Sequence, residues 1–230
     1  MSKICIIPAR GGSKRIPRKN IKHFLGKPII AYSIQAAIDS KLFDRIIVST
    51  DDEEIKKIAI QFGAEVPFLR SSENSCDHAP VASVLIEVLE TFAEQGNHYD
   101  EVCCLFATAP FITCNQIVSV NKLVNDIDCD SAFTVQDFGY PIFRALKNNE
   151  TGNLEMVWKE HQNTRSQDLP KTFHDAGQVY WIKTQSLLTQ KTLFTKNAKG
   201  FELKKSDAVD IDTEEDWKTA ELFYQLIRSK

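Results

Sequence analysis

Short apolar segments typical of buried strands alternate with amphipathic helical segments along the first part of the chain. The strand patterns lie at residues 3–8, 44–51, 64–70, 99–110 and 129–137. The helical patterns lie at residues 28–40, 52–63, 79–96 and 115–126. Strands that alternate with helices in this way favour parallel pairing, because each helix carries the chain back to the same edge of the sheet. The sequence therefore predicts a doubly wound α/β domain with a mostly parallel sheet.

The pattern changes at about residue 138, where the chain becomes irregular and polar up to about residue 172. A β-hairpin is expected within this stretch, turning at Thr151-Gly152-Asn153. An apolar strand resumes at residues 173–182, and the tail ends in an amphipathic helix. We expect one domain over residues 1–230, with residues 138–172 forming a protruding arm.

The composition indicates an ordinary globular protein, with 43% apolar residues, 26% charged residues and a net charge of −3. A net negative charge argues against a general nucleic-acid binder. The six cysteines show no metal-binding spacing, so we expect reduced thiols in a cytoplasmic protein. No apolar stretch approaches the ~20 residues that span a bilayer, and none has the form of a signal peptide, so no membrane partner is expected.

The first predicted strand runs directly into a basic, glycine-containing loop, "CIIPARGGSKRIPRKNI". Seven basic residues and no acidic residue lie between Pro8 and Lys27. Ligands of open α/β sheets bind at the carboxyl ends of the strands, where glycine backbone approaches phosphate closely. Hydrogen bonds from Lys14, Arg18 and Lys19 would strengthen such binding. A polyphosphate ligand therefore explains the loop better than a solvated surface does. Neither G-x-x-x-x-G-K-[ST] nor G-x-G-x-x-G is present.

Two carboxylates, Asp210 and Asp212, are separated by one residue in "DAVDIDTEEDW". On an extended segment they point to the same side and can share one Mg²⁺, which favours carboxylates together with phosphate oxygens. The alternative is a helix cap, with Asp212 as the capping residue and Glu215 completing the capping box.

Six stretches in a fixed order resemble the CMP-sialic acid synthetase family, the cytidylyltransferases that activate nonulosonic acids. They are "IPARGGSKRIPRKN", "GKPIIAYSIQAA", "IIVSTDDEEI", "FLRSSENSCDHAP", "RSQDLP" and "VDIDTEEDW". The resemblance implies a Rossmann-like sheet of the nucleotidyltransferase type and an enzyme that uses CTP and Mg²⁺. It implies transfer of CMP to the anomeric hydroxyl of a nine-carbon sugar acid, with release of pyrophosphate.

The resemblance also assigns roles to residues of this chain. The nucleotide-binding residues are Ala9, Arg10, Gly11, Gly12, Ser13, Lys14, Lys19, Asn20, Arg70 and Asp77. The catalytic residues are Lys19, Asn20, Asp210 and Asp212, of which the two aspartates bind the metal. The sugar-binding residues are Phe106, Arg165, Gln167, His174, Asp175 and Gln178. Simpler roles remain open for three of them: helix capping for Asp77, a surface charge for Arg165 and a turn for Asn20.

Departures from the sialic acid type indicate which branch of the family the chain is similar to. Phe106-Ala107 stands in place of a glutamine-proline pair, Ile112 in place of an arginine, and "HDAG" in place of "RENG". These features resemble the branch that acts on pseudaminic acid. Synthetases for N-acetylneuraminic, legionaminic or Kdo acids are alternatives. An inactive nucleotide-binding protein is another, although the intact lysine, asparagine and aspartates argue against it.

A homodimer is expected from the arm. Its apolar residues are isolated among polar ones, so they would pack on a second copy. They are Phe143, Leu154, Met156 and Trp158. The resemblance likewise implies a dimer whose arm reaches the neighbouring site.

Overall fold

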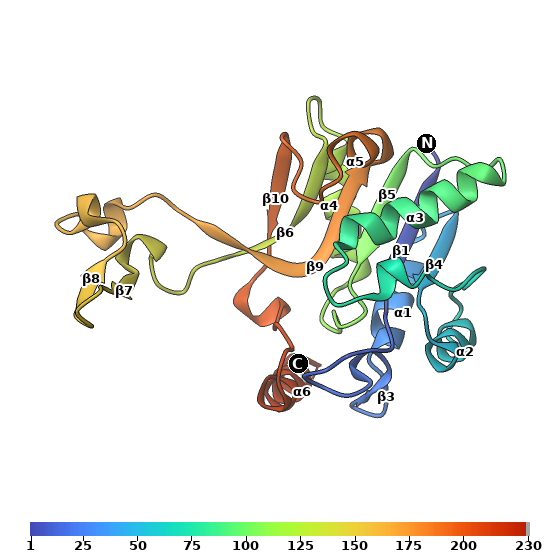
Figure 1. The fold of residues 1–230 in the computed structure, drawn as a ribbon, viewed down its shortest axis with the longest axis horizontal. Helices are drawn as coiled ribbons and strands as arrows, with labels where there is room; N and C mark the ends of the chain where they lie inside the picture. The colour runs from blue at the N-terminus through green and yellow to red at the C-terminus, as the bar shows by residue number, and fades with distance from the viewer. Residues whose placement is uncertain (229–230) are drawn as a thin grey trace.

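The computed structural model describes residues 1–228 and has a central mixed sheet in the order β10-β6-β9-β5-β1-β4 (Figure 1). The strands are β1 (Lys3–Pro8), β4 (Arg45–Ser49), β5 (Glu101–Leu105), β6 (Ser131–Asp137), β9 (Phe173–Lys183) and β10 (Ala198–Glu202). β1 pairs in parallel with β4 and β5, and β10 pairs in parallel with β6. Among the described strands of this sheet, only β9 runs antiparallel to its neighbours. The mostly parallel α/β sheet is thus confirmed.

Helices cover both faces of the sheet (Figure 1). One face packs against α1 (Ile30–Ser40), α2 (Glu53–Gln61) and α4 (Cys114–Val124). The other face packs against α3 (Val81–Glu94) and α5 (Thr184–Gln190). α2 and α3 each bury one apolar stripe, as the spacing of their apolar residues dictates, whereas α1 buries residues around most of its first turns.

A third apolar cluster holds the last helix, α6 (Glu214–Arg228), beside the segment that follows the basic loop. The short hairpin β2 (His23–Phe24) and β3 (Lys27–Pro28) forms part of it. Phe24 packs edge-to-face on Trp217 and Tyr224, with ring centroids 5.7 and 5.5 Å apart. This packing brings the residues just before α6 next to the basic loop.

The arm leaves the sheet between β6 and β9 and stands well away from the body of the molecule (Figure 1). The expected hairpin is present as β7 (Leu146–Asn148) and β8 (Leu154–Met156), and no residue from 138 to 172 is buried. Phe143 packs on Trp158 with ring centroids 5.5 Å apart. Neither ring is buried, and Leu154 is 67% exposed, so packing of these residues on a second copy stays a prediction.

A few predicted elements differ from those of the structure. Residues 64–70 were expected to form a strand, but only one isolated bridge, from Ile47 to Glu65, forms there. The sequence pattern missed α5, β10 and the β2–β3 hairpin, whose strands have two residues each. Short 3-10 turns lie at η1 (Lys19–Ile21), η2 (Glu73–Ser75), η3 (Ile142–Arg144), η4 (Lys159–His161), η5 (Ser166–Asp168) and η6 (Lys205–Asp207).

All six cysteines are free thiols in the structure. No helix within residues 1–228 has the length and apolar character needed to cross a membrane.

Candidate active site

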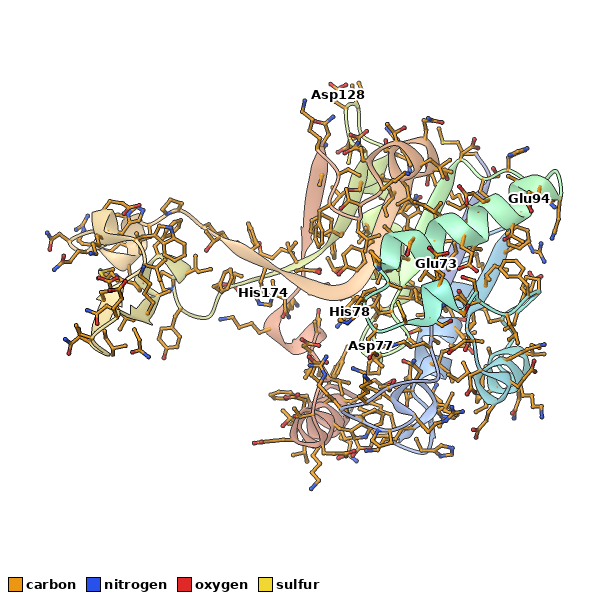
Figure 2. The ribbon with its side chains drawn as sticks, viewed as in Figure 1. Glu73, Asp77, His78, Glu94, Asp128 and His174 are labelled. Carbon is orange, nitrogen blue, oxygen red and sulfur yellow. The ribbon has the colours of Figure 1, made fainter. Side chains whose placement is uncertain are left out.

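A cleft of about 900 Å³ opens at the carboxyl ends of β1 and β5, where successive strands are added on opposite sides of β1. This is the topological switch point at which open α/β sheets bind ligands. The cleft is lined by the basic loop, the segment before α3, the first half of β9 and residues 209–212. In Figure 2, Asp77 lies before α3, and His174 lies on the part of β9 that leads to the arm.

Cations of the basic loop that line the cleft are paired with carboxylates from distant segments. Asp77 pairs with Arg10 (2.5 Å) and with Lys14. Asp212 pairs with Arg15 (2.5 Å) and Lys19 (3.4 Å). The hydrogen bond from Lys14, and then that from Arg10, lowers the pKa of Asp77. The loop is therefore held over the cleft by the same carboxylates that surround the expected phosphate site.

Arg18 does not face the cleft, contrary to the expectation that it binds phosphate. Its guanidinium makes two hydrogen bonds to Asp52, at 2.6 and 2.8 Å, and a third to Glu54 at 2.6 Å. Asp52 also accepts from the amides of Glu54 and Ile55 at the start of α2. The Arg18 hydrogen bonds lower the pKa of Asp52 to about 2. Arg18 thus fastens the basic loop to α2.

Gly11 completes this attachment from the other end of the loop. Its N–H donates to Asp51 at 2.8 Å, and a Cβ there would lie 2.8 Å from the Asp52 carboxylate. Glycine is therefore needed for contact with protein rather than with phosphate. Ala9, Gly11 and Gly12 do not line the cleft, whereas Ser13 does. Nucleotide binding by the first three residues stays a prediction.

Lys19 and Asn20 lie on η1 and both line the cleft. The Lys19 ammonium donates to the Ile211 carbonyl at 2.5 Å. The Asn20 amide donates to the Arg10 carbonyl at 2.9 Å and so closes the loop on itself. Lys19 therefore connects the loop directly to the segment that carries the aspartates.

Asp210, Ile211 and Asp212 all line the cleft, but only Ile211 is buried, so the two aspartates flank a buried residue as an extended segment requires. Partial desolvation in the cleft, followed by repulsion from the Asp212 carboxylate, raises the pKa of Asp210. Within residues 1–228, no hydrogen bond or ion pair is found for the Asp210 carboxylate. A cation held by both carboxylates would relieve this repulsion, so the pair fits a hard divalent metal.

The helix-cap alternative for Asp212 is wrong. The Thr213 hydroxyl accepts from the Asp216 amide at 3.2 Å, and the Asp216 carboxylate accepts from the Thr213 amide at 2.8 Å. This reciprocal pair is the capping box of α6. Asp212 therefore does not cap α6. No cluster of three or more metal-binding side chains occurs in the described chain, so a metal here would need further oxygen ligands from outside the protein.

Arg70 lies at the end of the cleft nearest β4 and is only 8% exposed. It donates to the Ser49 hydroxyl at 3.0 Å and to the Ser49 carbonyl. Burial lowers its pKa. The capping role considered for Asp77 is not found, because Pro80 occupies the N-cap of α3.

The other half of the cleft is formed by β9 and the end of β5. Phe106 packs against Tyr180 with ring centroids 5.4 Å apart. The Asp175 carboxylate accepts from the Tyr180 hydroxyl and from the Gly177 amide (3.0 Å). The His174 ring contacts the Asp175 backbone carbonyl at 2.9 Å rather than its carboxylate, so the two side chains form no dyad. Gln178 is buried in the same wall.

Arg165 and Gln167 do not belong to this cleft. They lie at η5 on the arm, where Arg165 donates to Asp168 at 2.6 Å and its side chain is 73% exposed. The structure of a single chain therefore does not bring them to the other expected sugar-binding residues.

Several lining residues escaped the sequence analysis: Arg15, Asn74, Gln136, Tyr180 and residues 191–194. Arg15 lies among the basic residues of the loop, so its charge was a usable signal. The segment 191–194 carries no such signal, because it reaches the cleft only through the packing of α5.

A family model described as cytidylyltransferase matches residues 4–228. The chain belongs to the cytidylyltransferase family. A pseudaminic acid cytidylyltransferase of Campylobacter jejuni (serotype O:23/36, strain 81-176) is 42% identical over 226 residues, covering 98% of this chain and 97% of the relative. A CMP-N,N'-diacetyllegionaminic acid synthase of Legionella pneumophila (strain Philadelphia 1) is 30% identical, covering 97% and 96%.

The fold agrees with this family. The solved structure of a CMP:2-keto-3-deoxy-manno-octonic acid synthetase with CTP aligns with a TM-score of 0.73 at 17% identity. The alignment covers 99% of this chain and all of that structure. The nucleotidyltransferase fold expected from the sequence is thus confirmed.

Proposed function

We propose that this protein transfers CMP from CTP to the anomeric hydroxyl of pseudaminic acid and releases pyrophosphate. The observation that carries the proposal is the cleft, in which a basic loop faces a pair of aspartates. The 42% identity to a pseudaminic acid cytidylyltransferase over nearly the whole of both chains supports the acceptor.

The nucleotide occupies the half of the cleft between the basic loop and α3. Arg10, Lys14 and Lys19 exchange their carboxylate partners for phosphate oxygens when CTP binds. Charge-assisted hydrogen bonds to phosphate are strong enough to compete with partly exposed ion pairs. Arg70 and Asp77 border the same half and position the nucleoside. Ser13 lies with them at the cleft surface.

Asp210 and Asp212 would hold Mg²⁺. The metal, when bound, polarises the phosphates and neutralises charge that develops on them. Lys19 and Asn20 hold the α-phosphate end of the nucleotide beside these carboxylates. The acceptor oxygen then forms a bond to the α-phosphorus, the bond to the β-phosphate oxygen breaks, and the hydroxyl proton passes to solvent. Positioning and electrostatics supply the catalysis, as in other phosphoryl-type transfers.

The acceptor occupies the half of the cleft over β9. An aromatic wall of Phe106 and Tyr180 suits an apolar end such as the terminal methyl of pseudaminic acid. N-Acetylneuraminic acid ends in hydroxyl groups, to which these aromatic rings offer no hydrogen-bond partner. The polar neighbours His174 and Asp175 lie at the exposed rim of the same half.

A pyrophosphate-release assay with CTP, Mg²⁺ and separate sugar acids tests the proposal. We expect kcat/KM for pseudaminic acid to exceed that for N-acetylneuraminic acid at least about tenfold. Equal or reversed preference would refute the acceptor but leave cytidylyl transfer standing. No release with any acid would support the inactive nucleotide-binding alternative.

The functional unit is proposed to be a homodimer. The arm extends from the body without a buried residue, and its Leu146 and Leu154 are 56% and 67% exposed. A second copy would cover them and could receive Arg165 and Gln167 at its own cleft. The guanidinium fork of an arginine suits the carboxylate of a sugar acid.

A further inference from the structure

The carboxylate of Asp212 holds two cations of the basic loop, one on each oxygen. The Arg15 guanidinium donates to Oδ2 at 2.5 Å, and the Lys19 ammonium donates to Oδ1 at 3.4 Å. These are the oxygens that Asp212 would offer to a divalent cation. The loop cations and a metal ion therefore compete for the same carboxylate.

The two cations are held to Asp212 in different ways. The Lys19 side chain is 20% exposed, and its ammonium also donates to the Ile211 carbonyl at 2.5 Å. The Arg15 side chain is 69% exposed, and within residues 1–228 its only hydrogen-bond or ion-pair partner is Asp212. The carbonyl keeps Lys19 beside the aspartates, whereas Arg15 can leave Asp212 at little cost, because an exposed ion pair is weak.

A triphosphate in the cleft would offer Arg15 a stronger partner. Arg15 lines the same cleft as Lys14 and Asp210. A guanidinium can bind two phosphate oxygens at once through parallel hydrogen bonds, whereas a single hydrogen bond joins it to Asp212. Binding of the nucleotide therefore favours transfer of Arg15 from the carboxylate to the phosphates, and this transfer leaves Oδ2 of Asp212 available to a metal ion.

We infer that Arg15 is a latch on Asp212, which keeps divalent cations from this carboxylate until the triphosphate binds. While the latch is closed, the guanidinium covers Oδ2, and its positive charge repels a cation at the pair of aspartates. Nucleotide binding opens the latch and so raises the affinity for the cation, and by linkage the cation raises the affinity for the nucleotide by the same factor. The inference rests on the proposed function and assigns an order to its binding steps.

Binding of Mn²⁺ to the protein without nucleotide, measured by electron paramagnetic resonance, tests the latch. We expect Arg15→Met to lower the dissociation constant of Mn²⁺ roughly fivefold, because it removes the guanidinium and keeps an unbranched side chain. Arg15→Lys keeps the charge and should bind Mn²⁺ like the wild type. Lys14→Met is the matched control, because it removes one charge from the same loop, but that charge pairs with Asp77, so Mn²⁺ binding should not change.

Equal dissociation constants of Mn²⁺ for wild type and Arg15→Met, or undetectable binding to both, would overturn the inference. An equal effect of Lys14→Met would also overturn it, because it would indicate a general effect of loop charge. Titration of CTP in the presence of EDTA tests the opening of the latch: Arg15→Met should weaken binding of CTP several-fold, and an unchanged affinity would refute the transfer. Binding of Mn²⁺ that persists in Asp210→Asn with Asp212→Asn would instead refute the proposed metal site.

Discussion

Lys19 joins the basic loop to the segment that carries the aspartates, through its bond to the Ile211 carbonyl. Replacing it with alanine should lower kcat/KM for CTP roughly ten- to a hundredfold, because a charge-assisted contact contributes about 1.5–3 kcal/mol. No acid lies nearby along the chain, so the sequence alone predicts that folding gains little from Lys19. The structure places Asp212 at 3.4 Å, so we also expect a loss of melting temperature of roughly 2–4 °C, equivalent to about 1 kcal/mol.

Lys22→Ala is the control for this measurement. Lys22 belongs to the same basic stretch but pairs with Glu214 at 2.5 Å and lies outside the cleft. The Lys22→Ala variant should keep kcat/KM for CTP near the wild-type value. Equal losses for the two variants would contradict a phosphate-binding role for Lys19.

The two aspartates should be needed for turnover but not for folding. Asp210→Asn removes a charge that is repelled by Asp212, so the folded state gains. Asp212→Asn loses the ion pairs with Arg15 and Lys19, so the folded state loses. The double variant should therefore keep its circular dichroism spectrum and a cooperative melt, yet release no pyrophosphate at millimolar Mg²⁺. Near-wild-type activity would exclude these residues as metal ligands.

Asp216→Ala, in the same segment, should instead lower stability and leave activity intact. Loss of the α6 capping box should cost about 1 kcal/mol of stability. Pyrophosphate release should persist, because Asp216 serves Thr213 and the Asp212 amide rather than the cleft.

At the scale of elements, the attachment of the basic loop to α2 should control nucleotide binding from outside the cleft. Arg18→Met frees the loop from Asp52 and should raise KM for CTP several-fold. Arg45→Met is the matched control, because Arg45 pairs with Glu65 at the edge of the sheet, away from the loop. Arg18→Met loses the ion pairs to Asp52 and Glu54, and Arg45→Met loses the ion pair to Glu65, so a similar KM in both variants would exclude a positioning role for Arg18.

The ion pair between Arg18 and Asp52 also predicts that the stability of the protein depends on pH. The pKa of Asp52 falls from 3.8 to about 2 on folding, so its stabilising effect is complete above the unfolded value and is lost as pH falls toward 2. The shift corresponds to roughly 2 kcal/mol, which solvent screening at the partly exposed Arg18 reduces to about 1 kcal/mol. Denaturant titrations of wild type and Asp52→Asn should differ by this amount at pH 5 and converge near pH 2.

Long elements of this chain were predictable and short ones were not. The apolar period of residues 81–94 identifies α3, and the β-branched run at 3–8 identifies β1, because both bury continuous apolar surface. Residues 64–70 have strand-like composition, but Pro67 lacks a backbone donor, and only Glu65 forms a bridge there. The strand β10 is recognised only through its pairing with β6, which sequence patterns do not encode.

The sequence predicts those parts of the site that are formed by charged residues. Arg10, Lys14 and Lys19 stand out as cations, and they do line the cleft. Arg18 stands out equally but binds Asp52, because the partner of a charged residue is set by tertiary packing.

At the scale of the whole molecule, the arm is the feature that a single chain does not explain. It has no buried residue, and much of its apolar surface faces solvent. Sedimentation at micromolar concentration should give a mass near twice 26.1 kDa. A monomer at that concentration would contradict the dimer.

A complementation experiment tests whether the arm of one copy serves the site of the other. Arg165→Ala alters the arm and leaves the cleft intact, whereas Asp210→Asn with Asp212→Asn alters the cleft and leaves the arm intact. Each variant alone should be nearly inactive. In a mixed dimer, the intact cleft of the first copy faces the intact arm of the second, so mixing and refolding the two should restore part of the activity. A mixture no more active than its components would show that the arm does not act on the neighbouring cleft, even if the protein is dimeric.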